Sequence, residues 1–201
     1  MKEGLLLSIL YLLVAIRIAL TLFRKRISPA YRSMLKEYLD SFIVAGILAI
    51  FIITYVARSF YIPSESMLPT LKVNDYILVN RFVYKMASPS RGEVIVFHPP
   101  HVKNPEETDF IKRIVGVEND VVEVANGVLY LNGLPQDEPF IKEAIEADFP
   151  AYRVPPGHVF VMGDNRNNSD DSRYWGPLPL ENIVGKAFVI FWPFSRVGSL
   201  K

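Results

Sequence analysis

The stretch "DVVEVANGVLYLNG", Asp120 to Gly133, is the clearest indicator of the fold in this chain. Apolar and polar residues alternate on both sides of Asn126-Gly127, as in strands that bury one face. A two-residue Asn-Gly connection favours a type I′ turn, because both of its positions need a positive φ. The stretch therefore predicts a β-hairpin.

The residues around the hairpin predict more strands. Runs rich in Val, Ile, Phe and Tyr, separated by turn residues, cover 75–83, 93–98, 110–117, 154–162 and 184–192. No long segment among them shows the periodicity of a helix. We therefore expect residues 59–201 to form a mainly β domain of antiparallel strands.

Two apolar runs precede that domain. Leu5 to Phe23 contains 19 residues with one charge, Arg17, and Ser41 to Ala57 contains 17 residues with none. A 19-residue helix is about 29 Å long, close to the hydrocarbon thickness of a bilayer. The sequence thus predicts an N-terminal tail and first transmembrane helix over 1–23 and a second transmembrane helix over 41–58. A buried helix of a soluble domain is the alternative for the second run.

The charges between these runs predict their orientation. The loop at 24–40 carries five Lys or Arg residues, whereas Lys2 is the one basic residue before the first run. The positive-inside rule places such a loop in the cytoplasm and the β domain on the other side. A cleaved signal peptide is the competing interpretation of the first run, but its apolar core would be shorter.

The overall composition excludes some classes of function. A net charge of +1 over 201 residues gives no electrostatic reason to expect a nucleic-acid partner. The absence of cysteine excludes disulfides, thiolate chemistry and cysteine-based metal sites.

A candidate nucleophile, Ser66, lies at the centre of "PSESMLPT", Pro63 to Thr70. A hydroxyl is a weak nucleophile until a neighbouring base takes its proton. His98, His101 and His158 all lie beside Pro-rich turns, and no motif near them suggests an orienting carboxylate. A simple turn after a hydrophobic segment is the alternative interpretation.

Lys112 is a better candidate for the base. In "FIKRIVG", alternation places Phe110, Lys112 and Ile114 on one face of a strand. An amine among apolar neighbours has a lowered pKa and can act as a general base near neutral pH. Arg113 would point to the opposite face, where a carboxylate could hold it. From alternation alone, a lysine that extends off the sheet edge is the favoured interpretation.

A dense polar loop, "GDNRNNSDDSRYWGPL", follows the apolar strand that ends at Met162. Such a loop beside a buried strand suits a site that is shaped by hydrogen bonds. Its acidic spacing lacks the alternation and the terminal glutamate of a calcium-binding loop. A solvated turn remains an alternative.

Together these stretches resemble the bacterial type I signal peptidases, which are membrane-bound Ser-Lys serine proteases. "SESMLPTL" resembles the nucleophile box of that family, "KRIVG" its lysine box, and "GDNRNNSDDSR" its downstream box. The resemblance implies an endopeptidase that removes signal peptides from exported preproteins, cutting after small residues at positions −3 and −1. It implies no metal or nucleotide cofactor. It also implies a multi-pass protein of the bacterial inner membrane with an extracytoplasmic catalytic domain, whose partners are preproteins, the lipid bilayer and the export translocon.

The resemblance also assigns roles to residues. Ser66 would be the nucleophile and Lys112 the general base. The Ser64 hydroxyl and the Ser66 backbone N–H would form the oxyanion hole, and Ser169 would orient the lysine amine. The pairs Asp164–Arg113 and Asp171–Arg173 would support the site. The expected walls of the substrate pocket are Ile62, Met67, Phe110 and Ile111.

Two positions depart from the family pattern. Glu65 stands where the family often has glycine, and we expect its side chain to face solvent. Asn119 replaces a usual glycine, and Asn tolerates a left-handed backbone. Two other functions stay open, a maturation peptidase with one dedicated substrate and an inactive membrane-tethered β module that binds export clients. Soluble Ser-Lys repressors share the dyad, but their DNA-binding helices have no counterpart here.

Overall fold

The computed structural model describes residues 2–22, 28–51, 57–102 and 108–200. The chain divides into two compact units, Met1–Ala57 and Arg58–Lys201. The first unit is helical and the second is built from β-strands, so each is described by itself.

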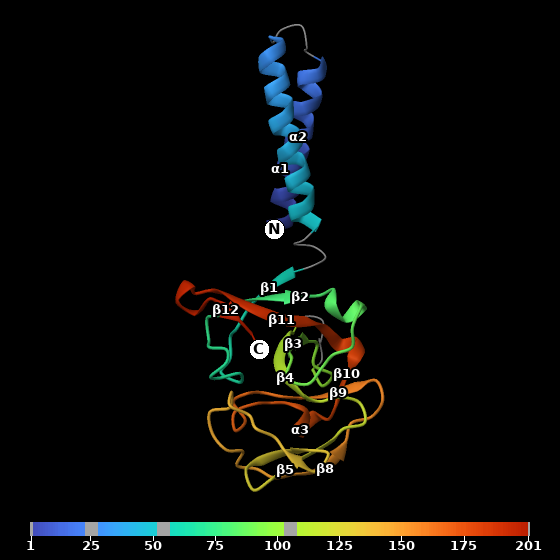
Figure 1. The fold of residues 1–201 in the computed structure, drawn as a ribbon, viewed down its shortest axis with the longest axis vertical. Helices are drawn as coiled ribbons and strands as arrows, with labels where there is room; N and C mark the ends of the chain where they lie inside the picture. Colours follow the sequence, from blue (N-terminus) through green and yellow to red (C-terminus); the bar gives the residue numbers. More distant parts are fainter. Residues whose placement is uncertain (1, 23–27, 52–56, 103–107, 201) are drawn as a thin grey trace. The chain divides into compact units, whose positions relative to one another are not determined.

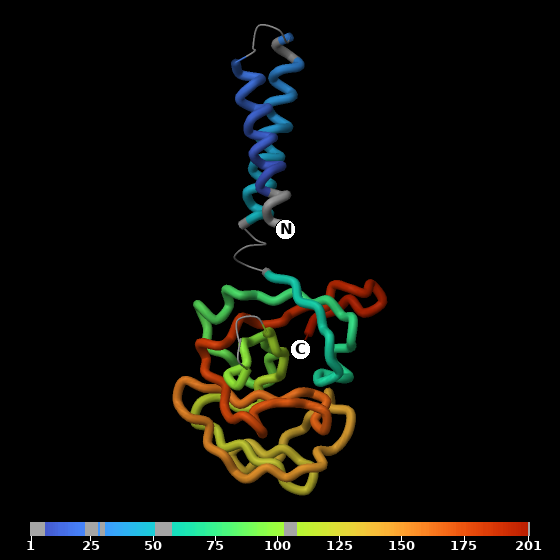
Figure 2. Tube along the Cα trace, turned by 180° about the vertical axis from the view of Figure 1, so that it is seen from behind, coloured from blue at the N-terminus to red at the C-terminus, as the bar shows by residue number. Residues whose placement is uncertain are grey.

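The helical unit contains α1 (Lys2–Leu22) and α2 (Pro29–Phe51), which lie side by side in both ribbon and tube (Figures 1 and 2). Arg17 of α1 forms two hydrogen bonds with the Asp40 carboxylate of α2, at 2.7 and 3.1 Å. Because α2 begins at Pro29, most of the loop predicted at 24–40 is helical. Pro29 at the first helical position suits a helix start, and residues 30–45 contain no glycine or proline to end it.

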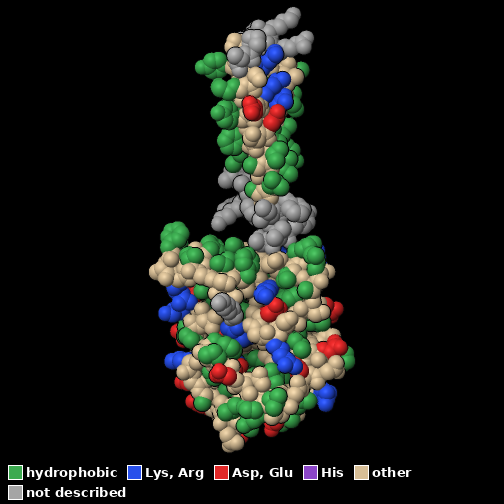
Figure 3. All heavy atoms as spheres, viewed as in Figure 1, with side chains coloured by type: hydrophobic (Ala, Val, Ile, Leu, Met, Phe, Trp, Pro, Cys, Tyr) green, Lys and Arg blue, Asp and Glu red, His purple; other side chains and the backbone are tan. Residues whose placement is uncertain are grey.

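Within the described residues, neither α1 nor α2 has a stretch both long enough and apolar enough to cross a bilayer. The predicted spans fall partly outside those residues, the first at Phe23 and the second at 52–56. Ala57 and Arg58, which the sequence assigned to the end of the second helix, belong instead to a strand. On the face that Figure 3 shows, the charged side chains coloured in this unit lie toward one of its ends.

The β unit confirms the mainly antiparallel prediction. Its large sheet has the strand order β1-β2-β11-β3-β4-β9-β10, and β12 pairs with β11. The pairings from β2 to β10 along this path, and that of β12, are all antiparallel. The strands are β1 (Ala57–Tyr61), β2 (Tyr76–Asn80), β3 (Val94–Phe97), β4 (Phe110–Gly116), β9 (His158–Met162), β10 (Leu178–Pro179), β11 (Ile183–Trp192) and β12 (Gly198–Ser199).

The small sheet contains the predicted hairpin. Its order is β7-β6-β5-β8, formed by β5 (Val121–Ala125), β6 (Val128–Leu131), β7 (Leu134–Pro135) and β8 (Phe149–Arg153). Ala125 pairs with Val128, and the two residues between them have φ values of +50° and +82°, as a type I′ turn requires. Figure 1 shows β5 and β8 of the small sheet at one end of this unit and β1, β2 and β12 of the large sheet at the other.

Short helices complete the β unit. The loop after β9 contains α3 (Ser172–Trp175), and the 3₁₀ turns are η2 (Val83–Lys85), η4 (Leu180–Asn182) and η5 (Phe194–Arg196). The helix α3 begins inside the polar loop that the sequence marked as a candidate site element, and Asp171 is its N-cap.

Strand β4 contributes to each of the three clusters of buried apolar side chains found in the described residues. Ile111 belongs to the first cluster with Ile62 and Met67. Val115 belongs to the second cluster, beside the small sheet, and Ile114 belongs to the third. Because β4 is covered on both faces, a lysine in its middle is removed from water.

Candidate active site

Ser66 and Lys112, 46 residues apart in the chain, meet in the β unit. The Lys112 Nζ lies 2.8 Å from the Ser66 Oγ and donates a hydrogen bond to it. The same amine donates to the carbonyl of Ile111 at 3.0 Å. Lys112 is only 4% exposed, so the pair is shielded from bulk water.

Burial determines the electrostatics of the amine. Desolvation lowers the pKa of Lys112 from 10.5 to about 8, and the carboxylates of Asp171, Asp170 and Asp164 partly oppose that shift. The amine also lies 5.4 Å from the centre of the Phe110 ring. An amine with such a pKa can take a proton from a hydroxyl near neutral pH, which an ordinary lysine cannot do efficiently.

The segment that contains Ser66, Pro63 to Thr70 (the serine segment), is held by its own buried side chains and by the polar loop. Met67 is fully buried next to Ser66, and the Leu71 N–H donates to the Met67 carbonyl at 2.9 Å. The Ser64 and Ser66 hydroxyl oxygens are 3.3 Å apart. The structure thus brings Ser64 close to the nucleophile candidate, and the part of Ser64 in an oxyanion hole stays a prediction.

Arg113 and Asp164 form the pair that the sequence predicted. The guanidinium donates two hydrogen bonds to the carboxylate, at 2.8 and 2.7 Å, and both side chains are nearly inaccessible to solvent. The Thr70 hydroxyl donates to the same carboxylate at 2.5 Å, and Arg113 donates to the Gly92 carbonyl at 2.7 Å. This pair ties the lysine strand to the polar loop and to the end of the serine segment.

Asp171 and Arg173 also form their predicted pair, with hydrogen bonds of 2.8 and 2.9 Å. Asp171 accepts a further hydrogen bond from the Gly163 N–H at 3.1 Å. It also caps α3 by accepting from the Arg173 backbone N–H at 3.3 Å. One carboxylate therefore joins the start of the polar loop to α3.

Ser169 lies in the same loop as Asp171, and its role in orienting the Lys112 amine stays a prediction. Its Oγ is buried and has no hydrogen-bond partner among the residues that the structure describes. A Cβ placed on Gly163 would lie 2.3 Å from that oxygen and 2.4 Å from the Ser66 carbonyl oxygen. A side chain at position 163 would therefore push the polar loop away from the serine segment.

Two supporting contacts were missed by the sequence. Arg166 and Glu138 form a buried bidentate pair at 2.6 and 2.8 Å, and Arg166 also donates to the Gly163 carbonyl at 2.9 Å. The Phe140 ring lies 4.0 Å from the guanidinium carbon of Arg113. Glu138 and Phe140 lie after β7, outside the three boxes, and no local pattern marks them.

The four residues predicted to line the substrate pocket differ in burial. Ile62 and Met67 are 1% and 0% exposed and pack in the same core cluster as Ile111, whereas Phe110 is half-buried. Their contact with a substrate stays a prediction. Glu65 is exposed, as expected, and Asn119 has the expected left-handed backbone with φ +71°.

The histidines have partners that the sequence did not reveal. His98 Nδ1 lies 3.3 Å from an Asp109 oxygen, and His101 Nε2 lies 3.2 Å from an Asp170 oxygen. His158 Nδ1 lies 2.9 Å from the Pro156 carbonyl. None of these contacts includes Ser66. Within the described ranges, no group of three or more histidine, aspartate or glutamate side chains is arranged to hold a metal ion.

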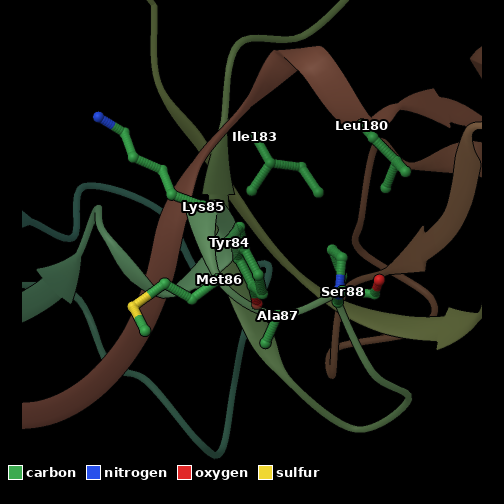
Figure 4. Close-up of a pocket in the computed structure, with 8 residues that line it drawn as sticks. Tyr84, Lys85, Met86, Ala87, Ser88, Leu180 and Ile183 are labelled. Carbon is green, nitrogen blue, oxygen red and sulfur yellow. The ribbon is translucent and has the colours of Figure 1, made fainter.

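A separate hollow of about 310 Å³ shares no residue with the Ser66–Lys112 pair (Figure 4). In Figure 4, the Lys85 side chain extends away from Ile183 and Leu180. The hollow is lined by Tyr84, Lys85, Met86, Ala87, Ser88, Pro89, Leu180 and Ile183.

Comparison with known proteins gives one family. Residues 35–192 match the family described as signal peptidase, peptidase S26. The probable signal peptidase I-1 of Synechocystis sp. is 45% identical over 176 residues, which cover 86% of this chain and 90% of that protein. The signal peptidase I of Leptolyngbya laminosa is 43% identical, with coverage of 86% and 87%. A solved signal peptidase I from Enterococcus faecalis is 29% identical and matches 50% of this chain and 97% of that chain, with a TM-score of 0.41.

Proposed function

This chain belongs to the signal peptidase family, peptidase S26, and is an enzyme that acts on signal peptides; we propose that it is a membrane-bound serine endopeptidase that uses a Ser66–Lys112 dyad. The observation that carries the proposal is the 2.8 Å contact between the Lys112 amine and the Ser66 hydroxyl in a buried site. A lowered pKa of Lys112, to about 8, supports its role as the base.

The reaction takes place in two stages. Ser66 Oγ attacks the scissile carbonyl carbon while its proton passes to the neutral Lys112 amine. The carbonyl oxygen becomes an oxyanion, which accepts hydrogen bonds from the Ser66 N–H and the Ser64 hydroxyl. The C–N bond then breaks and Lys112 gives its proton to the leaving amine. In the second stage, Lys112 takes a proton from water, whose oxygen attacks the acyl carbon. The bond from that carbon to Ser66 Oγ then breaks, and Lys112 returns the proton to Oγ. The signal peptide leaves as an acid that loses its proton to solvent and becomes a carboxylate.

We propose that the substrates have small residues at positions −3 and −1, as in an Ala-x-Ala site. Pockets walled by Ile62, Met67, Phe110 and Ile111 would exclude larger side chains by steric contact. Of the four, Phe110 keeps the most accessible surface and would contact the substrate, whereas Ile62 and Met67 are fully buried and would hold the wall from behind.

We also propose that the run from Leu5 to Phe23 and the run beginning at Ser41 anchor the enzyme in the bacterial inner membrane. The β unit would then lie on the extracytoplasmic side, beside the lipid bilayer and the export translocon. Arg17 lies within the first predicted span, and its two hydrogen bonds to Asp40 support this arrangement, since an ionisable side chain within a membrane is usually paired.

The test is cleavage of a preprotein with an Ala-x-Ala site by the full chain in detergent. Mass spectrometry should locate the cut after the second alanine. Lys112→Ala should lose about 10²- to 10⁴-fold in rate while keeping the wild-type circular dichroism spectrum. A folded Lys112→Ala variant that cleaves as fast as wild type would overturn the dyad. A folded wild type that leaves this preprotein intact would favour a dedicated substrate or a binding role.

A further inference from the structure

We propose that Asn165 is a positioning residue for the oxyanion hole, because it holds both peptide units that flank the Ser66 Cα. This inference rests on the proposed function, in which the Ser66 N–H donates to the oxyanion. Asn165 lies in the polar loop, almost a hundred residues from the serine segment, and is itself buried.

The two contacts are on successive carbonyls. The Asn165 side-chain amide donates from Nδ2 to the Glu65 carbonyl at 3.1 Å. The Asn165 backbone N–H donates to the Ser66 carbonyl at 3.0 Å. One residue thus fixes the peptide unit before Ser66 and the peptide unit after it.

The first of these contacts bears directly on the oxyanion. The Glu65 carbonyl and the Ser66 N–H belong to the same planar peptide unit and point in opposite directions. Holding the carbonyl oxygen therefore fixes the direction of the N–H. A hydrogen bond accepted by the carbonyl also polarises the amide, which makes its N–H a stronger donor.

The chemistry of this contact needs an amide side chain. Because a carbonyl can only accept, the atom of residue 165 that faces Glu65 must be a donor, and an ionised aspartate has none. Two further hydrogen bonds hold the loop that carries Asn165. The Asn168 N–H donates to the Asn165 carbonyl at 3.0 Å, and Arg166 donates to the Gly163 carbonyl at 2.9 Å.

The test compares Asn165→Asp with Asn168→Asp in the full chain. Asn168 is exposed in the same loop, so its variant adds the same charge without removing the clamp. The first readout is kcat and KM for the Ala-x-Ala preprotein. The second is the affinity for a peptide that ends in an aldehyde at the residue before the cut. The third is the affinity for the matching peptide alcohol.

The two peptides separate transition-state stabilisation from ordinary binding. Ser66 Oγ adds to the aldehyde carbon, its proton moves to the former carbonyl oxygen through Lys112, and that oxygen occupies the oxyanion hole. The alcohol has no electrophilic carbon and forms no such bond. A loss confined to the aldehyde therefore reports on the hole.

We expect Asn165→Asp to lower kcat by about tenfold, the effect of losing one hydrogen bond. Deleting an oxyanion donor itself costs more, about 100- to 1000-fold. The affinity for the aldehyde should fall by the same factor as kcat, while KM and the affinity for the alcohol stay unchanged. Asn168→Asp should match wild type in every readout. Asn165→Ala, which removes the donor without adding charge, should behave as Asn165→Asp does and serves if the latter fails to fold.

Two results would overturn the inference. One is a folded Asn165 variant with wild-type kcat and aldehyde affinity. The other is an equal loss of affinity for the aldehyde and the alcohol, which would assign Asn165 to substrate binding. Failure of the proposed function looks different, because wild type itself would then neither cleave the preprotein nor bind the aldehyde more tightly than Ser66→Ala does.

Discussion

The two sheets of the β unit contribute to the candidate site in different ways. The large sheet carries Lys112 on β4 and is joined to the segment that contains Ser66. The small sheet carries neither residue, but the loop after β7 supplies Glu138 and Phe140, which hold Arg166 and Arg113. The proposed reacting groups and part of their support thus come from separate parts of the chain.

The Arg113–Asp164 pair and the Glu138–Arg166 pair act on the site in different ways. Arg113 of β4, in the large sheet, and Asp164 of the polar loop join two segments that both belong to the proposed catalytic boxes. In the small-sheet loop, Glu138 has no proposed role in the reaction and acts on the site through Arg166. Four predictions test whether this division between chemistry and support is correct.

The largest effect on stability is expected in the large sheet. Asp164→Ala leaves the Arg113 guanidinium buried without its carboxylate, and breaking a buried ion pair in this way costs about 3–5 kcal/mol. Thermal unfolding of the full chain in detergent, followed by tryptophan fluorescence, measures this loss. Asp164→Asn, which keeps an oxygen acceptor, should lose less. A fully stable Asp164→Ala variant would show that the pair does not hold the two boxes together.

The next effect is the dependence of activity on pH. Since the pKa of Lys112 is lowered to about 8, the amine is protonated below that pH and cannot accept the Ser66 proton. The value of kcat/KM should therefore fall about tenfold per pH unit below 8 and level off above it. Asp170→Asn should move the midpoint down, because the Asp170 carboxylate raises this pKa.

A matched variant from the small-sheet loop sharpens the pH experiment. Glu138 is not among the charges that shift the pKa of Lys112. Glu138→Gln should therefore keep the wild-type midpoint even where its overall rate is lower. A shifted midpoint in this variant would mean that the small-sheet loop controls the base as well as the support.

The third effect is the stability of the Glu138→Gln variant itself. The amide still accepts a hydrogen bond from Arg166, so the expected loss is about 1–3 kcal/mol, smaller than for Asp164→Ala. Replacing the pair together, by Glu138→Leu with Arg166→Met, should restore the melting temperature. It should not restore kcat, because Arg166 no longer donates to the Gly163 carbonyl. Recovery of both quantities would show that the pair contributes stability alone.

The smallest effect is expected in the hairpin of the small sheet. Gly127 has φ +82°, and an added Cβ would lie 3.3 Å from the Ala144 Cβ. Gly127→Ala should cost about 1 kcal/mol of stability, because alanine is strained at a positive φ. The kcat of the folded variant should equal that of wild type. A lower kcat would contradict the view that the hairpin lies outside the chemistry.

The strands and the hairpin could be predicted from the sequence, because they depend on residues that are adjacent in the chain. Strand alternation and Asn126-Gly127 are local signals, and the structure has the hairpin and the antiparallel sheets that they indicate. Alternation alone favoured an exposed Lys112 at a sheet edge. The structure buries it, because β4 is paired on both sides, by β3 and β9, and packed on both faces.

The sequence could not predict contacts made between distant segments. Glu138 and Arg166 are 28 residues apart, and Asn165 reaches the Glu65 carbonyl across 100 residues. Nothing in the residues around Glu138 distinguishes it from an ordinary acidic residue in a loop. Glu138 gains its partner only because the fold brings the loop after β7 to Arg166 of the polar loop.

The position of β11 in the large sheet also determines when the β unit can complete its fold during synthesis on the ribosome. Within that sheet, β2 is joined to β3 and β4 through β11, which pairs with both β2 and β3. Residues 183–192 are translated after β1 to β10, so β2 has no strand pairing that joins it to β3 and β4 until those residues have been made. A nascent chain would thus gain proteolytic competence only after residues 183–192 had been made.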